Sequence, residues 1–365
     1  MINNRLFKAV FLMIIAAAVL SFSGCFPTGE KQQTETDLEE YKVGEKFEYS
    51  KDNLTAEFTI PEKLPQATRI GIKPKAFDSE EAIKLFFGDK AYTEGLESEG
   101  MLNTYETDDG SFFISFYGGG LKFYDNRVCN YEYPVDYGSL VNYCVPRVWD
   151  YNPPSDNELK DFPRETALNS AEELLKKLGI GNLGEPEVYP MSVEAIKRVV
   201  EEQGTYYDIQ KLSQEHECYV LRYSQLFDGT GMAPVPVIIG RAGYNDPAIT
   251  LVLTREGVVY FKAEMPLEND FEVLSREPVK YGLNYALGEF KRFHDAAYLD
   301  KGTIIYDFKP AYYPELIDES GTFEFVLMWT FEGRIVHREE DYTNRSRYVA
   351  AIRSDDGIVK TYKGG

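Results

Sequence analysis

Apolar residues recur at helical spacing in four stretches of the chain. In the first stretch, Asp78 or Ser79 is placed to cap the helix N-terminus, Glu81 completes a capping box, and Gly88 follows the last apolar residue. In the second, Gly179 stands where a C-terminal glycine is expected. The predicted helices cover residues 78–88, 163–179, 193–204 and 277–293.

Short runs rich in aromatic and β-branched residues lie between these helical stretches. Apolar and polar residues alternate in several of them, and turn residues separate them, as is typical of β-strands. The pair Asp356-Gly357 predicts a tight turn between the last two strands. The predicted strands lie within residues 110–119, 120–133, 218–229, 233–243, 248–265, 302–314, 322–333 and 347–362.

A helix followed by several strands occurs three times along the chain. This order predicts an α+β fold of repeated modules, in which one or two helices pack on one face of twisted antiparallel β-sheets. Turn-rich segments near residues 152–155 and 267–274 mark the edges of the modules. The predicted organisation is a lipoprotein signal peptide at 1–24, a flexible tether at 25–45, an N-terminal α+β module at 46–152, a middle module at 156–268 and a C-terminal module at 272–365.

The N-terminus has the pattern of a secretory signal. Two basic residues precede an apolar run over residues 9–20, which is shorter than the about 20 residues that a membrane-spanning helix needs. Small residues then lead to Cys25. This order resembles the lipobox of bacterial lipoproteins, in which the cysteine is diacylated and becomes the new N-terminus, although Phe22 replaces the usual leucine. The alternatives are an ordinary secreted protein and an uncleaved anchor with an incidental cysteine.

The lipobox predicts where the protein is located. Two acyl chains on Cys25 would hold it stably in the cell membrane, at the extracytoplasmic face. Residues 26–41 are polar with little to bury, so we expect them to be a flexible tether between the lipid and the folded domains.

The net charge excludes one class of partner. The full chain carries a net charge of -21, and removal of residues 1–24 deletes Arg5 and Lys8 and no acidic residue, which makes it -23. Nucleic acid binding needs a basic surface, so we expect no nucleic acid partner. We expect the acyl chains, and not surface charge, to hold the protein at the membrane.

Three cysteines follow the lipobox. Cys129 and Cys144 flank a segment with turn residues, and a disulfide between them would close a hairpin-like excursion. The alternative is two buried thiols. Cys218 lies in an alternating run and is expected in the core. Neither the cysteines nor the three histidines have metal-ligand spacing, so no metal or cofactor is predicted.

No catalytic signature is present in the sequence. His216, His294 and His337 each lie near a carboxylate and could act as a base, but a surface position near charged neighbours is the favoured interpretation of each. The acidic loops at 107–111 and 353–358 lack the staggered ligands of a calcium motif and are interpreted as hairpin turns. We therefore predict no catalytic residues.

The order of short motifs in the second half of the chain is distinctive. A strand with Tyr223 and Gln225 precedes a strand pair that begins at Gly257, a tyrosine-rich strand follows, and the next strand holds Trp329. This order resembles the YycH/YycI-like regulatory proteins and the wider set of extracytoplasmic domains related to the PepSY fold. The similarity extends over residues 162–365.

The resemblance implies a regulatory protein. YycI-like proteins are tethered by a membrane helix that can pair with the helix of a sensor kinase, whereas lipid chains offer no helical surface. We therefore expect a non-enzymatic, membrane-anchored lipoprotein whose folded domains modulate another envelope protein by contact, for example a two-component sensor kinase. The alternative is a lipoprotein that captures a peptide or a cell-wall fragment between its modules.

Tyr312 and Tyr313 stand together between two prolines. One interpretation makes them contact aromatics at an exposed edge. The other places one ring in the core and one at the surface, because consecutive strand residues point to opposite faces.

Overall fold

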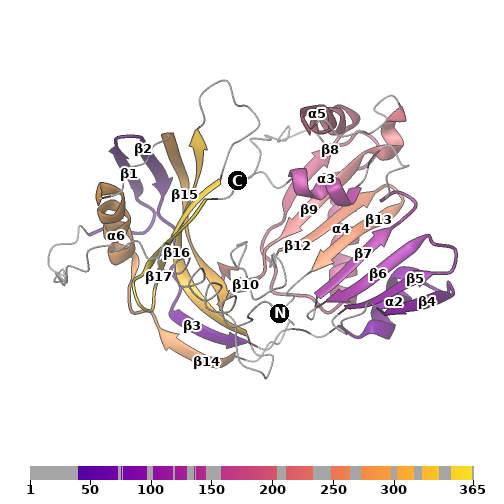
Figure 1. Cartoon of the computed structure of the whole chain (residues 1–365), viewed down its shortest axis with the longest axis horizontal. Coiled ribbons are helices and arrows are strands. Elements are labelled where there is room, and N and C mark those ends of the chain that lie inside the picture. The colour runs from indigo at the N-terminus through magenta and orange to yellow at the C-terminus, as the bar shows by residue number, and fades with distance from the viewer. Residues whose placement is uncertain are drawn as a thin grey trace, which may run out of the picture. The chain divides into compact units, whose positions relative to one another are not determined.

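The computed structural model of the chain contains two large β-sheets (Figure 1). No helix among its described residues is both long and apolar enough to cross a membrane. Strands predominate over helices in this part of the chain, so the fold is mixed α and β with a larger share of sheet than the sequence suggested. The structure describes residues 40–72, 75, 77–96, 102–117, 120–129, 135, 137–144, 158–203, 211–232, 248–263, 273–296, 302–315, 323–336 and 347–363.

The first sheet, which we call the middle sheet, has the strand order β4-β5-β6-β7-β13-β12-β9-β8. Every neighbouring pair is antiparallel. Its strands are β4 (Tyr92–Leu96), β5 (Leu102–Thr107), β6 (Phe112–Tyr117), β7 (Gly120–Asp125), β8 (Glu187–Met191), β9 (Cys218–Tyr223), β12 (Ile249–Thr254) and β13 (Gly257–Ala263).

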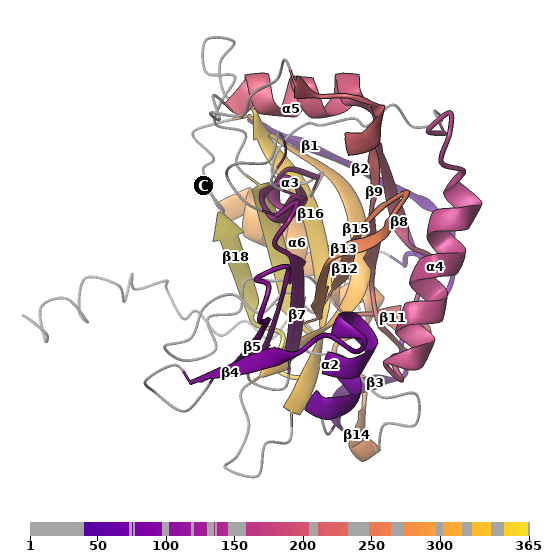
Figure 2. The same cartoon turned by 90° about the vertical axis from the view of Figure 1, so that its right-hand side faces the viewer.

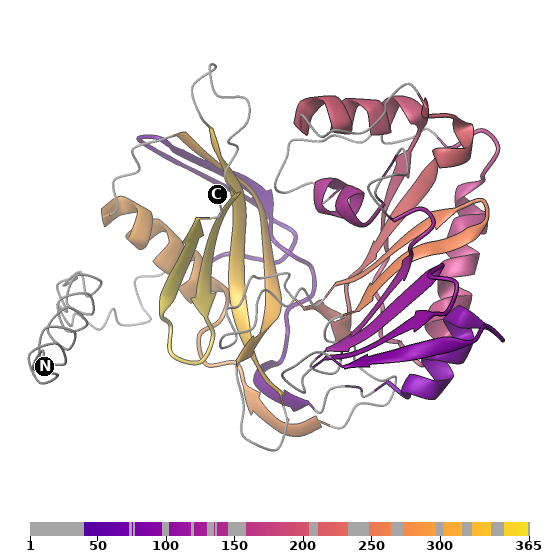
Figure 3. The ribbon, with the colours of Figure 1, turned by 45° about the vertical axis from the view of Figure 1, so that its right-hand side comes forward.

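Helices cover both faces of the middle sheet, as Figures 2 and 3 show. One face packs against α2 (Ser79–Phe87) and α4 (Arg164–Lys177), and the other against α3 (Tyr137–Cys144) and α5 (Val193–Gln203). The sequence predicted helices on one face only. The difference follows from β9, which is buried on both faces because alternate residues such as Tyr219 and Val220 enter different cores.

The second sheet, which we call the terminal sheet, joins the two ends of the described chain. Its order is β1-β2-β15-β16-β17-β18; β16 also pairs with β3, and β3 with β14. All pairs are antiparallel except β2 and β15. Its strands are β1 (Lys46–Lys51), β2 (Leu54–Thr59), β3 (Ala67–Ile72), β14 (Val273–Pro278), β15 (Gly302–Glu315), β16 (Phe323–Val336), β17 (Arg347–Arg353) and β18 (Val359–Lys363).

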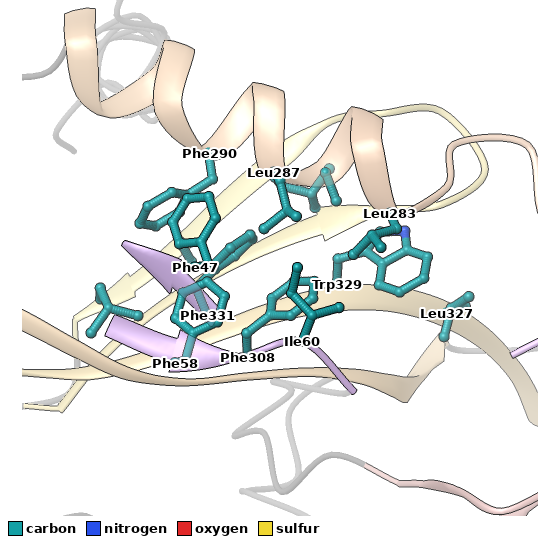
Figure 4. Close-up of a cluster of buried hydrophobic side chains, with 14 of the residues drawn as sticks. Phe47, Phe58, Ile60, Leu283, Leu287, Phe290, Phe308, Leu327, Trp329 and Phe331 are labelled. Atoms are coloured by element: carbon teal, nitrogen blue, oxygen red, sulfur yellow. The ribbon is translucent and has the colours of Figure 1, made fainter. Parts of the chain in front are cut away.

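An aromatic core lies between the terminal sheet and α6 (Leu283–Ala296), as Figure 4 shows. Phe290 of the helix stacks on Phe331 of β16, with ring centroids 4.2 Å apart. Phe58 of β2 stacks on Phe308 of β15 at 5.2 Å. Each ring is buried, so the core is continuous from the N-terminal strands to the C-terminal ones.

Strands of the predicted N-terminal module are divided between the two sheets. Strands β1 to β3 pair with C-terminal strands, whereas β4 to β7 extend the sheet of the middle segment. The predicted edge at residues 152–155 therefore lies within one sheet, because β7 before it and β8 after it both belong to the middle sheet. The edge at 267–274, in contrast, falls where the chain passes from β13 of the middle sheet to β14 of the terminal sheet.

The predicted helix ends agree closely with the structure at α2, α4 and α5. Asp78 caps α2 by accepting a hydrogen bond from the backbone of Glu81 at 3.0 Å, and Gly88 ends it with a positive φ of 62°. Gly179, with a positive φ of 66°, follows α4 as expected. Helix α6, in contrast, begins six residues later than predicted, because residues 277–278 complete β14 in the terminal sheet.

Candidate ligand site between the sheets

A cavity of about 330 Å³ is lined by residues of both sheets. Glu187 and Arg222 come from the middle sheet, Lys309 comes from the terminal sheet, and Lys63 comes from the connection between β2 and β3. The volume lies at the lower end of the range of about 300–1,000 Å³ that small-molecule sites occupy. The space therefore suits a small ligand or the end of a chain.

A short hairpin fixes one wall of this cavity. Strands β10 (Leu226–Phe227) and β11 (Thr230–Gly231) follow directly after β9 of the middle sheet. The Phe227 ring meets Tyr312 of β15 edge-on, with centroids 5.4 Å apart, and Met232 forms an isolated parallel bridge with the same tyrosine. The hairpin thus belongs to the core of the terminal sheet although the middle segment supplies it.

Cationic side chains predominate in the lining. Lys63, Arg222 and Lys309 face a single lining carboxylate, Glu187. Arg222 is only 6% exposed and forms an ion pair with Glu187, whose Oε2 lies 3.5 Å from the Arg222 Nη1. In a chain whose net charge is -21, a concentration of positive charge in one cavity is a distinct local feature.

The three cations differ in how far carboxylates neutralise them. Lys309 Nζ lies 3.2 Å from the buried Glu332 carboxylate and 3.3 Å from that of Asp307. Lys63 makes no ion pair within the described part of the chain. Among the three lining cations, Lys63 is therefore the one whose charge is most available to a ligand.

A second cavity, of about 480 Å³, lies on the middle sheet beside α2 and α4. Its lining is largely aromatic and aliphatic, with one cation, Arg127, and two carboxylates, Asp125 and Glu256. Arg127 donates two hydrogen bonds to the Asp125 carboxylate and lies over the Phe112 ring at 5.0 Å. It thus offers less charge to a ligand than the cavity between the sheets.

The predicted cysteine sites are only partly within the described residues. Cys25 lies outside them, so the lipobox stays a prediction. Cys129 follows β7, and its Sγ lies 3.4 Å from the backbone oxygen of Val259. Cys144 ends α3, but its side chain is not described, so the predicted disulfide is untested. Residues 137–144 form a helix and not the hairpin expected there.

The adjacent tyrosines of β15 are both buried. Tyr312 is 0% exposed and donates a hydrogen bond to the backbone oxygen of Ala67 at 2.9 Å, whereas Tyr313 is 2% exposed and hydrogen-bonds the hydroxyl of Thr330 at 2.9 Å. The predicted alternation is present, since the two rings belong to different clusters. The exposure expected for at least one of them is absent, because both faces of β15 are covered here.

The two described histidines have structural partners. The His294 ring bridges the Phe290 backbone oxygen and the Tyr348 hydroxyl, each at 2.8 Å, and burial lowers its pKa below the ordinary value. His216 forms a capping box with Ser213 at a short 3₁₀ helix. Both are buried and not at the surface as the sequence suggested. His337 lies outside the described residues.

The residues behind the YycH/YycI-like resemblance are core residues. Tyr223 and Gln225 are buried, and Trp329 donates its indole hydrogen to the backbone oxygen of Tyr281 at 2.8 Å. These positions define packing, not a binding surface.

Sequence reasoning missed all the charged residues of the cavity. Arg222 had one usable signal, because a charge inside an otherwise apolar strand needs a partner or a polar space. Lys63 and Lys309 had none, since only the pairing of distant strands brings them together.

Comparisons with known proteins place the chain by fold alone. No family model and no curated protein matches it. It is similar to the crystal structure, at 1.45 Å resolution, of an uncharacterized protein from Eubacterium rectale ATCC 33656. The TM-score is 0.60 and the identity 12%, over 86% of this chain and 93% of the other. The two proteins share a fold.

Proposed function

We propose that this chain is a lipid-anchored, extracytoplasmic protein that acts by binding and not by catalysis, and that the cavity between its sheets is the binding site. The cavity carries the proposal, because it combines a confined volume with an excess of positive charge and apolar lining from Met232, Pro310 and Ala311. Its ligand class is a peptide or cell-wall fragment. Anchoring through Cys25 would keep the binding site close to that material.

Modulation of an envelope protein, such as a sensor kinase, is the second candidate function. The observation that favours it is β4, the last strand of the middle sheet, which pairs only with β5 among the described strands. Its residues 92–95 are exposed, and Tyr92 keeps 45% of its surface accessible. An exposed strand edge is a surface on which a partner's strand can pair. The YycH/YycI-like resemblance of residues 162–365 supports this candidate.

The experiment compares the full chain, extracted from its own membrane, with a variant whose cavity is filled. Gly231 suits the variant because it lines the cavity, has no positive φ, and would have no heavy atom within 4 Å of a Cβ added to it. Gly231→Phe would therefore add a phenyl ring at the wall of the cavity without a clash at its first carbon. A small molecule that accompanies the wild type and is lost from this variant supports the proposal. Equal amounts on both would contradict it.

A further inference from the structure

We infer that the cavity between the sheets recognises the carboxylate end of a short peptide, with Lys63 and Arg222 as the groups that read the negative charge. This inference rests on the proposed function and specifies its ligand. It starts from the net charge of the cavity lining, which is positive because the lining holds three cationic side chains and one carboxylate.

The distribution of charge points to Lys63 and Arg222, which line the same cavity. Lys309 is already held by the carboxylates of Glu332 and Asp307. The Lys63 ammonium has no ion pair within the described residues, and the Arg222 guanidinium lies 3.5 Å from Glu187. A carboxylate entering here would gain charge-assisted hydrogen bonds, and the planar guanidinium suits its geometry.

The remaining lining favours a peptide over a phosphate. Glu187 in the same wall would repel a dianion but would accept a hydrogen bond from an amide or ammonium group. Met232, Pro310 and Ala311 add apolar surface that suits small side chains. A ligand with one carboxylate, nitrogen-bound hydrogens and little bulk satisfies all these groups, and a chain end fits a space of about 330 Å³.

The test measures binding of trialanine by the full chain in detergent, using titration calorimetry. The free acid is compared with trialanine carboxamide, which lacks the charge, and with inorganic phosphate. We expect the carboxamide to bind about tenfold more weakly than the acid, or worse, which corresponds to about 1.4 kcal/mol. Phosphate should not compete with the acid at equal concentration.

Two variants with the same change of charge locate the effect. Lys63→Glu makes the lining two cations and two carboxylates, and Lys160→Glu changes an exposed turn residue outside the cavity. Binding of the acid should fall at least about tenfold in Lys63→Glu and stay unchanged in Lys160→Glu. Both lysines are exposed, so both variants should unfold at the same temperature as the wild type. If Lys63→Glu unfolds at a lower temperature, Lys63→Gln replaces it in the binding measurement, because it changes the charge by half as much.

The outcomes separate this inference from the proposed function. Equal binding of the acid and the carboxamide, or unchanged binding of the acid to Lys63→Glu, overturns the carboxylate inference. If Gly231→Phe nevertheless abolishes binding of the tripeptide, the cavity remains a ligand site and the proposed function stands. Binding of phosphate without the tripeptide also overturns it. If neither tripeptide binds the wild type, the inference fails, and the molecules carried by membrane-extracted protein then decide the proposed function alone.

Discussion

Two buried tyrosines show how much one hydroxyl group contributes at the residue scale. The Tyr312 hydroxyl donates to Ala67, whereas the Tyr223 hydroxyl has no hydrogen-bond partner in the described part of the chain. Burial raises the pKa of Tyr223 to about 12, with smaller contributions from Glu172 and Glu185. The two rings are similarly buried, so they form a matched pair.

We expect phenylalanine to have different effects at these two positions. Tyr312→Phe should lower the free energy of unfolding by about 1 kcal/mol, because it leaves the Ala67 carbonyl without its partner. Tyr223→Phe should leave it unchanged or raise it, because no hydrogen bond is lost. Urea unfolding of both variants measures the difference. An equal loss at Tyr223 would show that its hydroxyl has a partner.

His294 predicts a pH dependence of stability. Because the Phe290 oxygen can only accept, Nδ1 of His294 carries a hydrogen. Burial favours the neutral ring, in which Nε2 has no hydrogen and accepts from the Tyr348 hydroxyl. Burial lowers its pKa in the folded state, while the unfolded chain titrates near 6.5. The unfolded state therefore binds more protons, so the stabilisation is complete above about pH 6.5 and declines as the pH falls through the lowered folded pKa.

The measurement is the urea midpoint at about pH 7.5 and about pH 5.5, on either side of the unfolded pKa. The wild type should lose more stability between these conditions than His294→Gln, which has no imidazole to protonate. If both proteins lost the same amount of stability between these two pH values, a group other than His294 would be responsible for the loss.

At the scale of elements, Gly333 shows why one strand pairing needs a residue without a side chain. It lies in β16 opposite Ile305, where β15 has a bulge between Ile305 and Asp307. A Cβ added at Gly333 would lie 2.3 Å from the Ile304 backbone oxygen and 2.6 Å from Ile305 Cδ1. The backbone oxygen cannot move away without disturbing the pairing of the two strands.

Gly333→Ala should therefore destabilise the fold by about 1–3 kcal/mol, the usual cost of overpacking. Gly231→Ala is the control, because its Cβ would meet no atom within 4 Å and should change stability by less than about 0.5 kcal/mol. Thermal unfolding compares the two. Equal stability of Gly333→Ala and the control would contradict this prediction. It would mean that β15 and β16 can move apart at the bulge with little loss of stability.

Local chemistry explains which elements could be predicted from sequence. Helix α2 was predictable to within a residue because Asp78 and Gly88 act on their own neighbours. Helix α6 was not, since Glu277 and Pro278 are held in β14 by pairing with β3, about two hundred residues earlier. Strands β1 and β2 were missed although Leu54, Ala56 and Phe58 alternate with polar residues in β2. Their position beside the C-terminal strands, in contrast, had no signal in the sequence.

The candidate site illustrates the same limit for the whole molecule. Lys63, Arg222 and Lys309 come from three distant segments, and periodicity says nothing about which segments meet. Tyr312 and Tyr313, which the sequence offered as contact residues, are instead covered on both faces of β15. Composition could not indicate a cationic cavity in a chain of net charge -21.

The central claim is that this protein binds a ligand between its sheets while a lipid anchors it at the membrane. The most direct test is native mass spectrometry of the full chain extracted from membranes, wild type beside Gly231→Phe. We predict a wild-type mass that includes two acyl chains and a small peptide-like ligand, and a variant that keeps the acyl chains but lacks the ligand. An unacylated wild type, or a ligand that survives in Gly231→Phe, would contradict this account.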